Sequence, residues 1–245
     1  MIDKGTWDSI VTLPDDVAVR TTNYHGKAIR QLHDLWGAWI DCVGEEHDFM
    51  FPVMLDAADD FQAATYTALT GYYRLSIAAL RSALELVSIG AWAQVCGKHQ
   101  ELADWRSGKK KISLGQACDG LIQGAQKLEF DLRQLVGDTL FAQKTSQREG
   151  GFARRIFDGI SDFTHARPGS TDGDMRGSNG PIYVRSAFHH VSRIQFEVFA
   201  LCYVLALLAR PKLPAPTPAL ELFDDPERAK SRVTRAAFQI LRNEI

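Results

Sequence analysis

Two long apolar segments constrain the fold more than any other feature of the chain. Residues 72–95 and 186–208 carry hydrophobic side chains around most of the helical circumference. A helix of this composition is buried, either in the core of a large protein or in a membrane. The longest unbroken apolar run covers only residues 198–209, whereas about 20 residues are needed to span a bilayer. We therefore expect two buried core helices and no membrane partner.

The rest of the chain shows the three- and four-residue spacing that is typical of amphipathic helices. Residues 24–43 place Ile29, Leu32 and Trp36 on one helix face. Pro52 suits the first position of a further helix, because its missing N–H is not needed there. Additional helices are expected at residues 101–105, 114–125, 129–136, 152–165 and 225–242. Because no convincing period-two run occurs, we predict an all-α multi-helix bundle of six to eight helices.

The chain length sets the expected domain organisation. The 245 residues suffice for one large domain or two small ones, since a domain holds about 100–200 residues. We expect residues 1–210 to form a helical bundle domain. Prolines concentrated between residues 211 and 218 make a stiff connector, so residues 211–245 are expected to hold a Pro-rich connector and a peripheral C-terminal helix. The Gly- and Pro-rich connection at residues 167–181 is long for a compact domain, and such loops are often functional.

The net charge and the cysteine spacing limit which functions and which cellular compartment we expect. Lys and Arg number 28 and Asp and Glu number 30, which gives a net charge of −2. The chain therefore has no overall basic field that attracts nucleic acid, and RNA binding would need a local patch. The four cysteines form no CxxC pair, and the N-terminus lacks the apolar core of a signal peptide. These features predict a cytoplasmic protein with reduced thiols.

Motifs for cofactors and metals are absent from the sequence. It contains no Gly-rich phosphate loop, no GxGxxG, no HExxH and no GxSxG. Nucleotide cofactors, zinc proteases and serine hydrolases are therefore not indicated. His189 and His190 point to different sides of a helix, so they do not easily ligate one metal. We expect no cofactor and no metal.

Charged residues interrupt the apolar segment 72–95 on one side. Arg74, Arg81, Glu85 and Ser88 fall within one arc of the helix. Arg81 and Glu85 are four residues apart and can pair along the helix. The stripe is either a polar site within the bundle or an ion pair that fixes helix register. Because a buried charge that loses its partner is costly, replacing Glu85 by Ala is expected to cost on the order of 3 kcal/mol.

A second polar stripe lies on the expected helix 152–165. Asp162 precedes His165 by three residues and can orient the imidazole, raise its pKa and select its tautomer. We predict a site where His165 ends its helix, with its ring within about 8 Å of Arg81 or Glu85. The candidate catalytic residues are then His165, Asp162, Arg81 and Glu85. The alternative is a solvated face whose terminal histidine bonds a backbone carbonyl.

Three segments together resemble families of uncharacterised bacterial helical proteins. They are residues 73–85 (YRLSIAALRSALE), 159–168 (GISDFTHARP) and 178–183 (SNGPIY). Some of these families are remotely similar to the HEPN superfamily of helical ribonucleases and toxins. The resemblance covers about residues 60–210 and implies an all-helical, HEPN-like fold. It also implies metal-independent RNA cleavage, in which a histidine is the general acid and base and an arginine stabilises phosphorane-like charge.

HEPN ribonucleases carry an Arg-x4–6-His motif, and two places in this chain fit it. Four residues separate Arg185 from His190, and four separate Arg20 from His25. Arg185 and His190 are therefore the alternative catalytic pair, and a dimer would bring two such pairs together. His165 departs from the motif, because no arginine precedes it at the required distance.

Nothing in the sequence demands catalysis, so whether the protein is an enzyme stays open. We predict a protein that acts through association, as a homodimer or other homo-oligomer or with a protein partner, because its apolar helices could extend into an interface. The alternative is a metal-independent HEPN-like ribonuclease of a toxin or phage-defence system. In that case RNA phosphates would meet the basic residues at 109–111 and 228–235.

Overall fold

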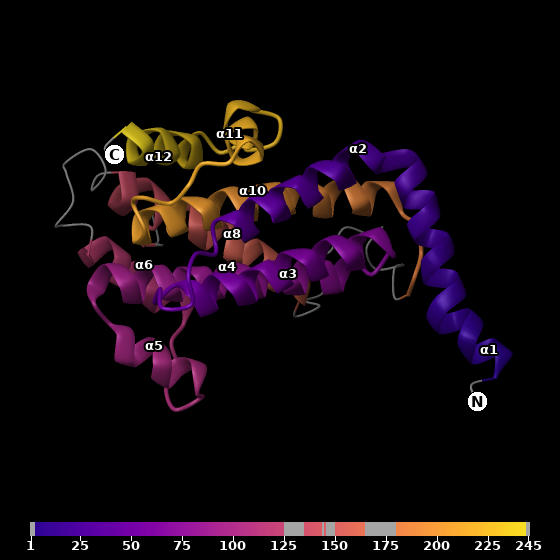
Figure 1. The fold of residues 1–245 in the computed structure, drawn as a ribbon, viewed down its shortest axis with the longest axis horizontal. Coiled ribbons are helices and arrows are strands. Elements are labelled where there is room, and N and C mark those ends of the chain that lie inside the picture. Colours follow the sequence, from indigo (N-terminus) through magenta and orange to yellow (C-terminus); the bar gives the residue numbers. More distant parts are fainter. Residues whose placement is uncertain (1–2, 125–134, 144, 146–149, 165–179, 244–245) are drawn as a thin grey trace.

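The computed structural model describes residues 3–124, 135–143, 145, 150–164 and 180–243. Helices are the regular elements within these ranges, which confirms the predicted all-α multi-helix bundle (Figure 1). In chain order they are α1 (Lys4–Trp7), η1 (Asp8–Thr12), α2 (Leu13–Asp41), α3 (Phe51–Leu69), α4 (Tyr73–Cys96), α5 (His99–Arg106), α6 (Leu114–Gly124), η3 (Leu135–Leu140), α8 (Phe152–Thr164), α10 (Arg185–Ala209), α11 (Thr217–Asp224) and α12 (Arg232–Asn243), where η denotes a π-helix.

Helices α4 and α10 form the centre of the bundle, with α3 packed on α4 and α2 across α3 and α10. Gly90 allows α3 and α4 to approach closely, because a Cβ there would lie 2.7 Å from the Val53 side chain. By length and composition alone α4 and α10 could each cross a bilayer, yet 61% and 83% of their most apolar stretches are buried inside the protein. Their apolar surfaces are thus covered by other helices of the same chain.

The helix predicted from residue 24 begins much earlier, at Leu13, and is broken at His25. His25 has φ −131° and ψ 18°, outside the helical region. Residues 3–24, which comprise α1, η1 and the first part of α2, project from one end of the bundle (Figure 1). We call this segment the N-terminal arm. Pro14 near the start of α2 is compatible with the helix, since no intrahelical N–H bond is required there.

The C-terminal residues form two helices that pack on α10. The aromatic rings of Phe223 on α11 and Phe238 on α12 stack with their centroids 3.9 Å apart. Both rings also contact Tyr203 of α10, whose hydroxyl donates a hydrogen bond to the carbonyl of Pro214. The aromatic side chains therefore join the connector and both C-terminal helices to the bundle core. The division between residues 1–210 and 211–245 stays a prediction.

Two other sequence predictions fall largely beyond the described residues. The helix expected at residues 129–136 lies outside them except for its last two positions, which belong to η3. The connection expected at residues 167–181 lies outside them except for Gly180 and Pro181.

Candidate functional site

The polar stripe of α4 contains the ion pair that its spacing predicts. The Arg81 guanidinium lies 3.6 Å from the Glu85 carboxylate, and the two side chains are 30% and 25% exposed. Arg81 also donates a hydrogen bond from Nε to the Ser161 hydroxyl on α8, at 3.1 Å. Its guanidinium lies over the Phe157 ring, 4.8 Å from the centroid. The stripes of α4 and α8 therefore meet, through Ser161 and Phe157.

The predicted centre of that site, His165, lies outside the described residues, so its distance from Arg81 and Glu85 stays a prediction. Asp162 is half-buried on α8. Arg154, near the start of α8, pairs with Asp119 of α6 and donates a hydrogen bond to the Phe141 carbonyl at 3.1 Å. The polar residues of α8 therefore contact two different helices: Ser161 contacts α4, and Arg154 contacts α6.

A cleft of about 600 Å³ lies beside the Arg81–Glu85 pair. Helix α3 contributes three aspartates to it, and α5 contributes an indole and a guanidinium. Burial raises the pKa of Asp60, and the neighbouring carboxylates Asp56 and Asp59 add to this effect, while a hydrogen bond with Ser82 opposes it. Arg106 pairs with Asp56 at 2.8 Å. The carboxylates outnumber the cations, so the cleft favours positively charged groups. In the sequence, Asp56, Asp59 and Asp60 lie off the apolar face of their helical pattern, which predicts solvent exposure and gives no sign of a cleft.

The alternative catalytic residues Arg185 and His190 have different neighbours. The His190 ring lies 5.2 Å from that of Phe163, and Arg193 donates to His190 Nδ1 at 3.3 Å. Arg185, at the start of α10, is close enough to His25 to lower the pKa of that histidine. The two Arg-x4-His matches are therefore interleaved in space, with Arg185 acting on the histidine of the other match.

His25 is the centre of an aromatic and basic cluster at the base of the N-terminal arm. Its Nε2 lies at hydrogen-bond distance, 2.9 Å, from the Tyr183 hydroxyl. Its ring stacks on Phe188 at 4.5 Å and meets His189 edge-on at 4.7 Å. Arg20 lies over the Tyr183 ring. Burial, together with the charges of His189 and Arg185, lowers the pKa of His25, so its neutral form is favoured. The Arg20–His25 spacing, Arg185 of the other match and the adjacent His189 and His190 were sequence signals in this region, but nothing in the sequence placed them together.

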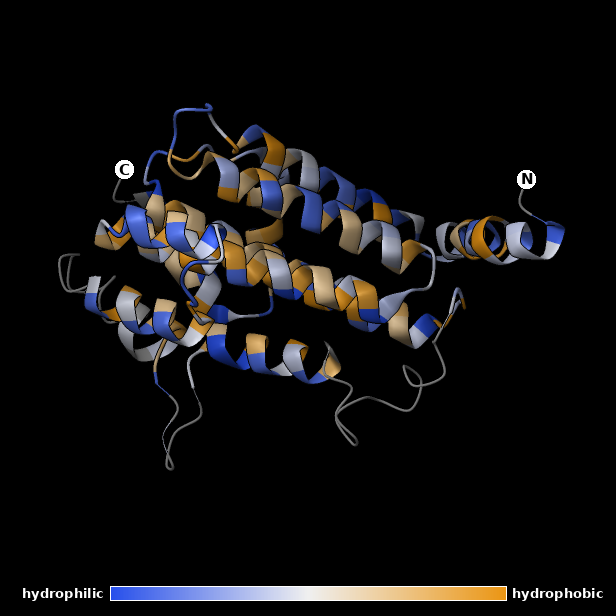
Figure 2. Cartoon of the chain, turned by 90° about the horizontal axis from the view of Figure 1, so that it is seen from below, coloured by the Kyte–Doolittle hydropathy of each residue, from blue (hydrophilic) through white to orange (hydrophobic). Residues whose placement is uncertain are grey.

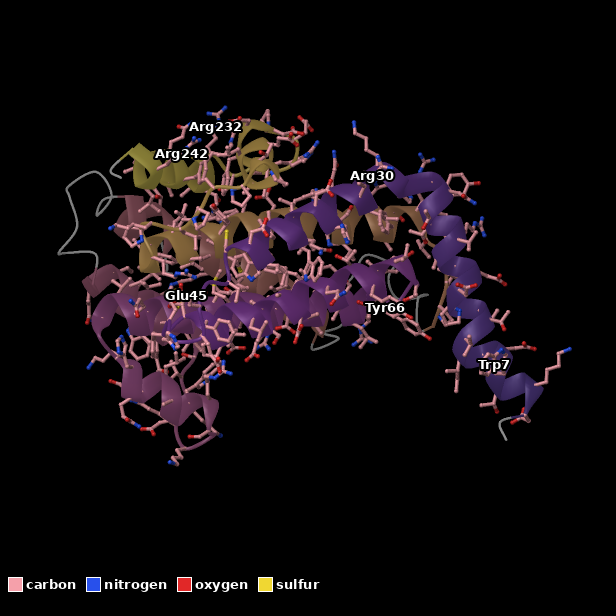
Figure 3. The ribbon with its side chains drawn as sticks, viewed as in Figure 1. Trp7, Arg30, Glu45, Tyr66, Arg232 and Arg242 are labelled. Carbon is pink, nitrogen blue, oxygen red and sulfur yellow. The ribbon has the colours of Figure 1, made fainter. Side chains whose placement is uncertain are left out.

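The outer part of the N-terminal arm exposes large apolar side chains. Trp7 is 52% exposed and Ile10 is 64% exposed, and Val11, Leu13 and Val19 are also exposed. The adjacent end of the bundle exposes Tyr66, Leu75 and Ile182. Figure 3 labels Trp7 on the arm and Tyr66 at this end of α3, and Figure 2 shows hydrophobic residues along the arm where it stands apart from the bundle. The arm and this end together form a surface of unburied apolar residues.

Cysteine and metal chemistry receive no support from the described residues. Burial raises the pKa of Cys42 to about 11 and that of Cys118 to about 12. Both thiols are therefore protonated and poor nucleophiles at neutral pH. Within the part of the chain that the structure describes, no group of three or more His, Cys, Asp or Glu side chains is placed to hold a metal ion.

Comparisons with protein-family models, with curated proteins and with solved structures yield no match to this chain. The HEPN resemblance thus rests on the residues quoted for it.

Proposed function

We propose that the protein acts through association, and that the N-terminal arm binds a second copy of the chain. The observation that carries this proposal is the apolar stripe of the arm, which includes Trp7 and Ile10 and is uncovered in the single chain. Contiguous exposed apolar residues of this size mark interaction surfaces. Trp in particular is enriched among the residues that dominate binding energy once an interface forms.

Charge complementarity favours a second copy as the partner. Apart from Arg20 at its base, the arm carries four aspartates and a single lysine. The adjacent bundle end carries Arg74 and Arg185 at the starts of α4 and α10. The acidic arm of one copy therefore matches the basic, partly apolar end of another. A two-fold axis would repeat this contact and close the assembly as a dimer.

The bundle end that would receive the arm is closely packed at the turn between α3 and α4. At Gly71 a Cβ would lie 2.6 Å from the Ile182 carbonyl oxygen, and Gly71 has φ 86°. The turn between α3 and α4 therefore touches the backbone that precedes α10. This contact brings Ile182 beside the turn that leads into α4, whose first turn carries Leu75. The net negative charge of the arm also disfavours anionic lipid as an alternative partner.

The test is the molar mass in solution of the wild-type chain and of two variants, measured by light scattering after size-exclusion chromatography. We expect a dimer for the wild type and a monomer for Trp7→Glu combined with Ile10→Glu. Ile40→Glu is the control, since Ile40 is an apolar residue that is 38% exposed near the other end of α2, and this variant should stay dimeric. A monomeric wild type, or a dimeric double variant, would overturn the proposal.

A second candidate function is metal-independent RNA cleavage. The observation that favours it is that Arg185 of one Arg-x4-His match acts on His25 of the other, whose ring also meets His189. A histidine would transfer the proton and an arginine would stabilise the developing charge. RNA degradation in the presence of EDTA tests this, with His189→Ala, His190→Ala and His165→Ala compared with the wild type. Equal degradation by all four proteins, or none by the wild type, counts against it.

A further inference from the structure

A second cavity, of about 340 Å³, lies between α8 and α10. Its lining is largely apolar, and the polar side chains that also line it are Arg155, His190, Arg193, Glu197 and Lys230. The apolar lining consists of Phe152, Ile156, Ile160, Phe163 and Ile194. An apolar cavity with a few converging polar side chains is the usual form of a small-molecule site.

Glu197 lines this cavity and has one satisfied and one unsatisfied oxygen. Its Oε1 accepts a hydrogen bond from the backbone N–H of Lys230, at 2.9 Å. Its Oε2 is buried and has no hydrogen-bond partner among the described residues. Burial raises the pKa of Glu197, while the backbone N–H groups of Lys230 and Ser231 and the charges of Arg193 and Lys230 lower it. Because a buried acceptor without a donor is destabilising, a ligand that brings an N–H donor to Oε2 would complete the arrangement.

Two arginines, Arg155 and Arg193, also line this cavity. Unlike Glu197, they would bind an anionic group of a ligand. Arg193 donates to His190 at 3.3 Å, and Arg155 donates to the Gly150 carbonyl at 2.8 Å. Among the described residues neither guanidinium forms an ion pair with a carboxylate, and both side chains are exposed. A guanidinium binds a carboxylate well, through two parallel hydrogen bonds. The cavity lining thus includes one carboxylate and two guanidinium groups, together with the side chain of Lys230.

We propose that this cavity binds a free aromatic amino acid. The ligand ammonium would donate to Glu197 Oε2, its carboxylate would meet Arg193 and Arg155, and its ring would fill the apolar wall. Its size also fits. If a cavity of roughly 150 Å³ holds benzene, about 340 Å³ holds about 14 non-hydrogen atoms, and phenylalanine, tyrosine and tryptophan have sizes near this value. This inference does not rest on the proposed association.

The first experiment is isothermal titration calorimetry of the full chain with L-phenylalanine and two analogues. Phenethylamine lacks the carboxylate and 3-phenylpropionate lacks the ammonium. We expect a dissociation constant of about 10⁻⁴ M for phenylalanine, and at least about tenfold weaker binding of each analogue. An absence of saturable binding by phenylalanine would overturn the proposal. Binding of 3-phenylpropionate as tight as that of phenylalanine would overturn the role of Glu197.

The second experiment uses Gly159→Leu to fill the cavity. Gly159 lines it, and a Cβ there would meet nothing within 4 Å. Leu is also a better helix former than Gly, so the variant should fold at least as well as the wild type while losing phenylalanine binding more than tenfold. Gly37→Leu in α2 is the matched control, because Gly37 is equally unobstructed and lies outside the cavity. Unchanged phenylalanine binding by Gly159→Leu contradicts the proposed location.

Discussion

Helix α10 and the N-terminal arm both carry large apolar side chains on helical segments, yet they differ in what covers them. α10 is buried over most of its length by α2, α3, α4 and α12, while Trp7 and Ile10 on the arm are more than half exposed. The comparison shows that an apolar helical pattern predicts a surface that is stabilised by burial against another element. It does not specify whether the cover comes from the same chain or from another.

The largest expected difference between these regions is in unfolding free energy. Leu84 on α4 is fully buried, so Leu84→Ala should cost about 3 kcal/mol through lost burial and a residual cavity. Ile10→Ala on the arm should change the unfolding free energy of the monomer by less than about 0.5 kcal/mol. Urea unfolding at concentrations below dimer formation checks both values. Equal losses would mean that the arm is an integral part of the fold.

The C-terminal helices are a third region whose contribution to the unfolding free energy can be compared with those of the core and the arm. Phe238 of α12 is nearly buried and stacks on Phe223. We expect Phe238→Ala to cost about 2–3 kcal/mol, at or slightly below the low end for a core aromatic, because α12 covers only one side of α10. Coincident urea transitions from circular dichroism and tryptophan fluorescence would show that residues 211–245 unfold with the bundle. A separate early transition would show an independent peripheral unit.

The Arg81–Glu85 pair is partly exposed, so its contribution to the unfolding free energy should lie between those of a buried and a fully exposed ion pair. The cost on the order of 3 kcal/mol expected from the sequence assumed a buried pair. Both side chains are about a quarter exposed or more, and Arg81 keeps Ser161 and Phe157 when Glu85 is removed. We therefore expect Glu85→Ala to cost about 1 kcal/mol, measured by urea unfolding. A value near 3 kcal/mol would show that this face is desolvated in solution, as the core is.

The smallest expected effect is a pH dependence at the break between the arm and the bundle. The pKa of His25 is lowered from 6.5 in the folded chain, so the unfolded chain binds a proton more readily. Stability should then fall as the pH drops below about 6.5 and be fully present above it. His25→Gln should weaken this dependence between pH 7.5 and pH 5. Parallel stability–pH curves for the two proteins would show that His25 is solvated.

The fold could be predicted from the sequence further than the site could. Helical spacing and the composition of residues 72–95 and 186–208 indicated the α-class and the two core helices, since period and burial are local properties of a segment. The pairing of Arg81 with Glu85 was equally accessible, because residues four apart share a helix face.

The remaining features depend on which elements come together. Asp56, Asp59 and Asp60 look solvated in the sequence, and only the packing of α3 against α4 and α5 gathers them around a cleft. His25 and His189 meet although they are far apart in the chain, and Glu197 becomes buried only because α8 and the backbone of residues 230–231 pack around it. Sequence alone therefore determined which faces are apolar and which residues pair within one helix. Tertiary structure decided which faces are covered, because desolvation and long-range contacts exist only between elements that have packed.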